Sequence, residues 1–301
     1  MKKRYSIFRI VFLSTVSICL IFVLTYLSKS EKKFFNFIGF KYASSDERLS
    51  VVSEKTIDLN NVNDISFNLN VDDITFIENT DEKIKIVEKC TKQLSENEKL
   101  QFNHQNNKID IYRSSKLNIN LLEKSFKREV IVYLPKSYNK NINIKLSIGD
   151  VDFSSDLKLN ELEIYLTTGD INIDNNIECK SFILEGNTGD ANINSLSSDE
   201  YGISFNTGNI EISNLSGKGY INTTTGDLRC NISDLTGNSD FSSSVGNITL
   251  NLKKEPNFKI NASCDIGDIK TDFTEDNIRE NFSNALNIDC GCGDIKINKN
   301  Y

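Results

Sequence analysis

Proline and tryptophan are almost missing from this chain, whose 301 residues include two prolines and no tryptophan. Proline cannot donate a hydrogen bond to a sheet ladder, so within sheets it is confined to edges, strand ends and bulges. Both prolines, Pro135 and Pro256, stand outside the glycine-centred strand pattern described below. That pattern therefore contains no residue that would break a continuous sheet.

Metal ligands and paired thiols are also scarce. The one histidine, His104, has no obvious partner, and none of the seven cysteines stands in CxxC spacing. Zinc sites and thioredoxin-like redox motifs depend on such closely spaced groups. The sequence therefore disfavours both chemistries, and we predict no cofactor.

Charge is unevenly distributed along the chain. The net charge is −7, but residues 1–33 carry seven Lys or Arg and one Glu, which leaves 28 basic and 41 acidic residues beyond them. An acidic body behind a basic tail argues against nucleic acid as a partner, because phosphate contacts need basic surfaces.

The amino terminus has the composition of a membrane segment. Basic residues precede an uncharged run from Ile10 to Leu27, which would span roughly 27 Å as a helix, about one hydrocarbon core. No small-x-small cleavage site follows, and Ile18 is too large to precede a lipidated Cys19.

We therefore predict a cytoplasmic tail and uncleaved single-pass anchor in residues 1–30, and a linker in 31–50. The basic residues ahead of the run favour an inside amino terminus, with the body extracytoplasmic at the cell membrane. A cleaved signal peptide is the alternative.

One short phrase returns eight times between Asn141 and Ile297. Each copy has a glycine, then Asp or Asn, then an apolar residue, at steps of 20, 20, 19, 18, 20, 21 and 26 residues. The glycines, which we predict to be structural turn residues, are Gly149, Gly169, Gly189, Gly208, Gly226, Gly246, Gly267 and Gly293. Self-similarity near twenty residues indicates a stacked repeat.

Apolar residues alternate with polar ones around each glycine, as in Leu162, Ile164 and Leu166 ahead of Gly169. This is the periodicity of a strand with one buried face. Glycine reaches positive φ without a Cβ clash, and Asp or Asn hydrogen-bonds readily within turns. We therefore predict an all-β, single-domain β-solenoid in which each repeat is strand, sharp corner, strand.

The regular repeats are expected over residues 141–301, and irregular rungs or a cap over residues 51–140. Within the earlier part, residues 65–76 fit the repeat template with Asp72 in the place of the glycine. This predicts a degenerate first rung.

The 26-residue step after Gly267 contains a helix-like stretch between Thr274 and Leu286. Thr274 suits a helix N-cap, and Ile278, Phe282 and Ala285 would share one face. We predict a short helix inserted before the last rung.

Cys264 and Cys290 each stand three residues before a corner glycine. They are expected to be neighbours on adjacent rungs, roughly 4.8 Å apart, which is within disulfide range. They are either a disulfide or, in the interpretation we prefer, two small apolar fillers of the stack.

Six of the eight residues that follow the corner glycines are aspartates, so carboxylates should recur along one edge of the solenoid. They are Asp150, Asp170, Asp190, Asp227, Asp268 and Asp294. We prefer exposed carboxylates that hydrogen-bond to their own turns. The alternatives are a Ca²⁺ site bridging Asp150, Asp170 and Asp190, since calcium takes hard oxygen ligands, and an edge that binds a cationic peptide.

The chain from Val51 to Ile297 resembles the bacterial family DUF4097, a putative adhesin domain. The resemblance rests on the repeated Gly-Asp/Asn phrase, the Ile131-to-Pro135 segment ahead of it, and the closing Gly-Asp-Ile-Lys-Ile. It implies a β-solenoid at the bacterial cell envelope, and it carries no catalytic residues. Some relatives look linked to envelope-stress sensing.

We therefore predict a membrane-anchored, extracytoplasmic, non-catalytic binding or structural module, with cell-wall polymer, cationic peptide or an envelope protein as partner. An accessory protein that senses envelope stress through a membrane partner is the alternative. A polysaccharide-active enzyme is less favoured, because its acid/base carboxylates would have to be Asp150 with Asp152, or Glu161 with Glu163, and all four fit as solvated strand residues.

Overall fold

The computed structural model describes residues 48–114, 127–273 and 282–301, and from Leu49 onward these form one compact unit. The described residues are strands, turns and bends, with no helix among them. The described residues therefore include no helix that is long and apolar enough to cross a bilayer. The predicted anchor lies outside the described residues. So does most of the predicted helix, although Ala285 and Leu286 at its end belong to a strand.

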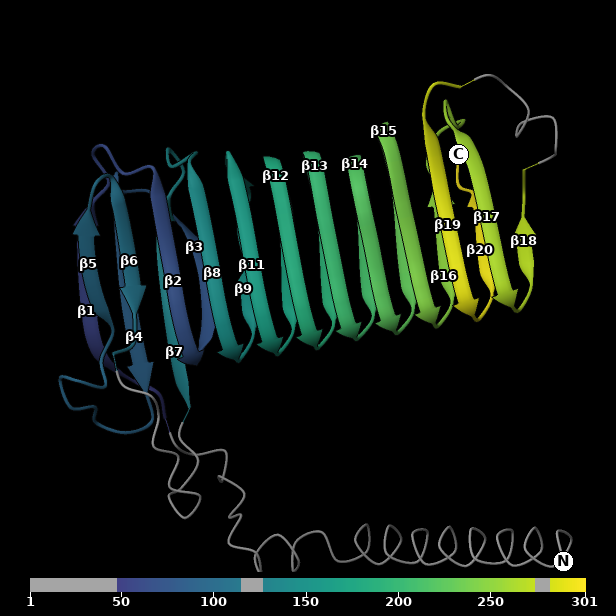
Figure 1. The fold of residues 1–301 in the computed structure, drawn as a ribbon. Coiled ribbons are helices and arrows are strands. Elements are labelled where there is room, and N and C mark those ends of the chain that lie inside the picture. Colours follow the sequence, from purple (N-terminus) through teal and green to yellow (C-terminus); the bar gives the residue numbers. More distant parts are fainter. Residues whose placement is uncertain (1–47, 115–126, 274–281) are drawn as a thin grey trace, which may run out of the picture. The chain divides into compact units, whose positions relative to one another are not determined.

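Each regular repeat is a rung made of one strand before a glycine corner and one strand after it (Figure 1). From the second corner to the fifth, the strand that leaves one corner continues into the next corner. The regular rungs comprise β8 (Asn141–Ile148), β9 (Val151–Phe153), β10 (Leu157–Lys158), β11 (Glu161–Thr168), β12 (Ile171–Thr188), β13 (Ala191–Thr207), β14 (Ile210–Thr225), β15 (Leu228–Val245) and β16 (Ile248–Leu252).

All neighbouring rungs in this region pair in parallel, and the residues that flank the corners keep the same register from rung to rung. Leu162 pairs with Ile142 on one side and with Phe182 on the other, one repeat away in each direction. The strands before the corners form one face, here called the pre-corner face, and the strands after them form the post-corner face. The predicted strand-corner-strand solenoid is therefore confirmed for the described residues.

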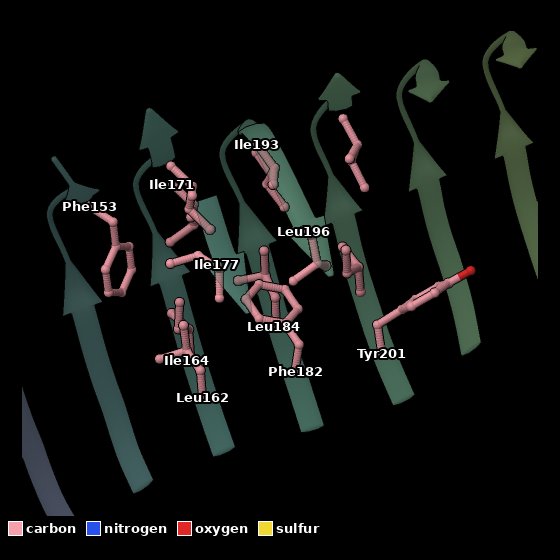
Figure 2. Close-up of a cluster of buried hydrophobic side chains, with 14 of the residues drawn as sticks. Phe153, Leu162, Ile164, Ile171, Ile177, Phe182, Leu184, Ile193, Leu196 and Tyr201 are labelled. Carbon is pink, nitrogen blue, oxygen red and sulfur yellow. The ribbon is translucent and has the colours of Figure 1, made fainter. Parts of the chain in front are cut away.

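Inward side chains from both faces fill the space between them. Figure 2 shows Leu162 and Ile164 from the pre-corner face and Ile171 and Phe153 from the post-corner face projecting into one core. These four side chains are completely buried. Burial of such a side chain contributes about 1.5–3 kcal/mol, so every rung depends on its neighbours for its stability.

The predicted degenerate rung is present. It consists of β2 (Asp64–Val71) and β3 (Asp73–Asn79), which pair in parallel with β8 and β9, so Asp72 takes the corner place opposite Gly149. Beyond it lie β6 (Lys108–Tyr112) and β7 (Arg128–Pro135), also parallel. Three antiparallel strands then close this end: β5 (Gln101–Gln105) on β6, β4 (Lys83–Cys90) on β7, and β1 (Ser50–Asp58) on β4.

The other end departs from stacking in chain order. Its strands are β17 (Lys259–Ile266), β18 (Ile269–Thr271), β19 (Ala285–Cys292) and β20 (Ile295–Lys299). The last rung in sequence, β19 with β20, pairs with β15 and β16 on one side and with β17 and β18 on the other. The Gly293 corner therefore lies between those of Gly246 and Gly267. The long step after Gly267 allows β17 and β18, which come first in the sequence, to form the outer rung, while β19 and β20 form the inner one.

The register can be tested with one aspartate introduced at two sites of the same rung. Ile171→Asp places a charge in the closed core and should lower the free energy of unfolding by about 3 kcal/mol or more. Thr167→Asp adds the same charge at an exposed position and should change it by about 0.5 kcal/mol or less. Urea unfolding of a soluble form comprising residues 34–301 measures both, and equal effects would contradict the register.

Candidate functional site

The glycine corners are held by backbone packing between rungs. Gly169 has a φ of +143°, a conformation that L side chains rarely adopt. A Cβ there would lie 2.6 Å from the carbonyl carbon of Gly149 and closer still to its oxygen. The other seven predicted corner glycines also have a positive φ, and a Cβ on each would meet the carbonyl of an adjacent corner in the stack.

The residue after each glycine links its rung to the next. Oδ1 of Asp150 accepts a hydrogen bond from the backbone N–H of Asp170 at 2.8 Å, and Oδ1 of Asp170 accepts from Asp190 at 2.8 Å. The same bond recurs through Asn209, Asp227, Asn247, Asp294 and Asp268 at 2.7–3.0 Å. We call this chain of bonds the corner ladder. The aspartates thus bond to the adjacent rung, whereas the sequence suggested bonds to their own turns.

The predicted calcium ligands Asp150, Asp170 and Asp190 are consecutive members of the corner ladder. Each already commits one carboxylate oxygen to an N–H of the next rung. Within the residues described, no three His, Cys, Asp or Glu side chains gather closely enough to hold a metal ion. The geometry therefore explains these carboxylates as backbone acceptors.

A shallow groove of about 410 Å³ crosses the pre-corner face over β2, β8, β11, β12 and β13. We call it the pre-corner groove. Its outward-facing polar side chains are Asn68, Lys145, Ser147, Tyr165, Thr167, Glu185, Asn187, Ser204 and Asn206. Lys145 Nζ lies over the Tyr165 ring, 5.5 Å from its centroid, and Asn206 donates to Asn187 at 2.7 Å. The groove therefore presents one aromatic ring among amides, hydroxyls and two charges.

Glu161 and Glu163 lie beside this groove, in a second hollow that shares Lys145. Partial burial and the nearby negative charges of Glu163 and Asp64 raise the pKa of Glu161. Asn143 also donates to Glu163. The pair proposed for acid/base chemistry is thus brought together, but on an open face.

The other carboxylate pair lies along the corner. Asp152 accepts from Asn172 Nδ2 at 3.0 Å, while Asp150 belongs to the corner ladder. Burial raises the pKa of Asp152, and the neighbouring acids Asp150, Asp174 and Asp73 add to the effect. Each carboxylate therefore has a structural hydrogen bond of its own.

A buried ion cluster behind the Asp72 corner was not predicted from the sequence. Arg113 donates from Nε to Asp72 Oδ2 at 2.9 Å and from Nη1 to Glu88 Oε1 at 2.7 Å, and all three side chains are at most 1% exposed. Burial opposes the charge of Arg113, but bonds and attraction from Asp72 and Glu88 outweigh it and raise its pKa. Arg128 lies 3.7 Å from Asp72 as well. Removing one partner of such a cluster costs about 3–5 kcal/mol.

Cys264 and Cys290 pair directly across β17 and β19, as predicted, and both are free thiols in the structure. Their Sγ atoms face corner carbonyls, with Cys264 at 3.1 Å from Gly293 O and Cys290 at 3.3 Å from Gly246 O. Burial, followed by the neighbouring Cys264, raises the pKa of Cys290 to about 11. A thiol in that state is a poor nucleophile.

These features match a known family. The Toastrack DUF4097 family model matches residues 62–298, and the chain belongs to that family. A putative adhesin from Bacteroides fragilis NCTC 9343 has 15% sequence identity and a TM-score of 0.51, covering 85% of this chain and 100% of its own. A putative adhesin from Parabacteroides distasonis ATCC 8503 has 14% identity and a TM-score of 0.51, with 83% and 98% covered.

A putative lipid binding protein from the same Parabacteroides strain is equally similar, at 15% identity and a TM-score of 0.51, with 83% of this chain and 96% of its own covered. At these identities the likeness establishes the fold and nothing finer. No curated protein matches the sequence.

The corner contact predicts a strong penalty for a single methyl group. Gly169→Ala must change the φ of the corner or separate two rungs, and should lower the free energy of unfolding by at least about 3 kcal/mol. Gly237→Ala is the control, because its φ is ordinary and its Cβ would meet only the flexible Lys218 side chain, at 2.8 Å. Urea unfolding of both variants measures the difference; similar losses would show that the corner is not specially constrained.

The corner ladder predicts that stability depends on a hydrogen-bond acceptor at the residue after each corner glycine, and not on its negative charge. Asp170→Asn should leave stability nearly unchanged, because Asn209 and Asn247 already serve as acceptors in the same column. Asp170→Ala should cost about 1 kcal/mol, the typical worth of one hydrogen bond.

Thermal unfolding with Ca²⁺ and with EDTA tests the calcium alternative on the same variants. A calcium site would raise the wild-type melting temperature, and Asp170→Asn would abolish the rise. The corner ladder alone predicts no effect of calcium on either protein.

Proposed function

We propose that this chain is a membrane-anchored, extracytoplasmic binding module of the bacterial cell envelope, with no catalytic activity of its own. Its ligand surface is the pre-corner groove, and its ligand is an extended polar polymer such as a cell-wall glycan. The observation that carries the proposal is the run of outward polar side chains around Tyr165, across five adjacent strands.

The chemistry of the groove suits sugar hydroxyls. Asn68 and Glu185 are exposed and make no side-chain hydrogen bond with other described residues, so they are available to a ligand. Amides both donate and accept, as sugar hydroxyls do, and carboxylates accept. Tyrosine offers an apolar ring face with a polar edge, which packs against the C–H face of a sugar. A parallel solenoid repeats such groups at roughly 4.8 Å, which favours an elongated ligand.

A non-catalytic role is supported by how the carboxylates are arranged. General acid/base work needs two carboxyls whose environments separate their pKa values around a bound substrate. Glu161 and Glu163 instead lie near each other in an open hollow, where Asn143 donates to Glu163, and Asp150 and Asp152 each accept a hydrogen bond from a neighbouring rung. Two of the similar solved structures are putative adhesins, which agrees with a surface-binding role.

The corner ladder favours a second candidate, in which the chain senses a cationic peptide for another membrane protein. Six aspartates in one column give this edge a negative potential that would attract such a peptide.

Binding of soluble glycan chains released from bacterial cell wall tests the first candidate. Tyr165→Ala should weaken binding about tenfold, the equivalent of 1.4 kcal/mol. Tyr133→Ala is the matched control, because Tyr133 also lies half-buried under a lysine, 5.9 Å from Lys85 Nζ, but on β7 of the post-corner side. Isothermal titration calorimetry measures both affinities.

Equal losses in the two variants, or no glycan binding by the wild type, would contradict the groove as the ligand surface. Binding of polylysine that is lost in Asp170→Asn, Asp190→Asn would instead favour the second candidate.

A further inference from the structure

The rung formed by β17 and β18 ends the solenoid with an open edge. β17 pairs with β19 on one side, and no strand of the described part pairs with its other side. Lys259 N donates to Asn284 O, so the odd-numbered residues of β17 turn their backbone groups toward β19. Because these groups alternate along a strand, those of Ile260, Ala262 and Cys264 point to the open edge.

The core is also open at this end. A hollow of about 520 Å³ is lined by inward residues of the last rungs, among them Ile260, Ala262, Ile269 and Ile288. Ile269 is 43% exposed, whereas Ile171, at the same place in its rung, is completely buried. An edge with free backbone groups and exposed apolar side chains is a template for pairing with another chain.

β17 is complementary to itself in the antiparallel direction. In a two-fold pair centred on Ala262, each Lys259 would face the Asp265 of the other copy, and Asn261 would face Ser263. Ile260 would face Cys264, and the open-edge backbone groups of both strands would all find partners. Moving the centre by one residue to Ser263 would place Lys259 opposite Gly267 and lose both charge pairs.

We infer that two copies of this chain associate tail to tail through antiparallel pairing of β17, with the two-fold axis at Ala262. The interface continues the pre-corner face across the axis and covers the open core of both copies. It uses the same surface of each copy, so it closes at a dimer.

The opposite end presents two antiparallel edge strands, β5 beside the pre-corner face and β1 beside the post-corner face. β1 carries a register shift between Val51 and Ser53 and charges such as Glu54 and Lys55, and bulges and charges on an edge strand oppose pairing with another sheet. β5 has no charged side chain to face Lys259 and Asp265 of β17, so pairing of β17 with itself is favoured over head-to-tail stacking.

Charge exchange tests the inference on the full-length chain in a density-matched detergent. Lys259→Asp and Asp265→Lys each put like charges together twice per dimer and should weaken the dimer at least tenfold in sedimentation equilibrium. The double variant restores opposite charges and should recover wild-type association. Both side chains are exposed and make no ion pair with other described residues, so the fold should tolerate the exchanges.

Ala262→Pro is a second probe, because it removes an N–H that faces the open edge and not the ladder to β19. It should give a monomer with a wild-type melting temperature.

A wild-type monomer at tens of micromolar would overturn the inference, as would a dimer that both single variants leave intact. Failure of the double variant to recover, with its melting temperature unchanged, would overturn the Ala262 register. Glycan binding by a monomeric variant would show that the proposed function does not depend on the dimer.

Discussion

The contact between successive glycine corners is the constraint on which the rest of the structure depends. The carbonyl of one corner lies close to where the Cβ of the next corner residue would be, so each of these rungs needs a glycine at its corner. Asp72 is the exception because it is the first corner of the stack: it offers its carbonyl to Gly149. The contact aligns the rungs, and alignment decides which side chains face the core, because a shift of one residue would turn Ile171 outward. Repeats of 18 to 21 residues are accommodated by register shifts away from the corner, such as that between Ile173 and Asn176.

Much of the polar surface serves this same alignment. The corner ladder uses carboxylates and amides interchangeably, and further amide bonds run between rungs, as from Asn251 to Asn231 and from Asn298 to Asn251, both at 2.7 Å. Asparagine recurs because its amide both donates and accepts at the spacing of parallel strands. Side chains used in this way are less available to a ligand. The pre-corner groove differs because several of its outward groups are not so used, and that difference, more than its depth, is why we propose it as the ligand surface.

The sequence was sufficient to predict the rungs and their inward residues, because the same pattern occurs eight times and each copy supports the alignment of the others. It was also sufficient for Asp72, whose flanking residues keep the template. It could not provide the partners of Asp72, since Glu88 lies on β4 and Arg113 follows β6, both outside any repeat. Nor could it order the last two rungs. Gly267 and Gly293 are both followed by Asp-Ile-Lys, so no local feature distinguishes the inner rung from the outer one.

The exchange of the last two rungs explains why the two ends of the solenoid differ. β20 lies between β16 and β18 and has ladders on both sides. The edge position among the described strands therefore falls to β17 and β18, and β17 is the strand through which we infer pairing with a second copy. At the other end, three antiparallel strands and a buried ion cluster close the core. The two ends therefore differ because the chain connects their strands differently, although the rungs between them are nearly uniform.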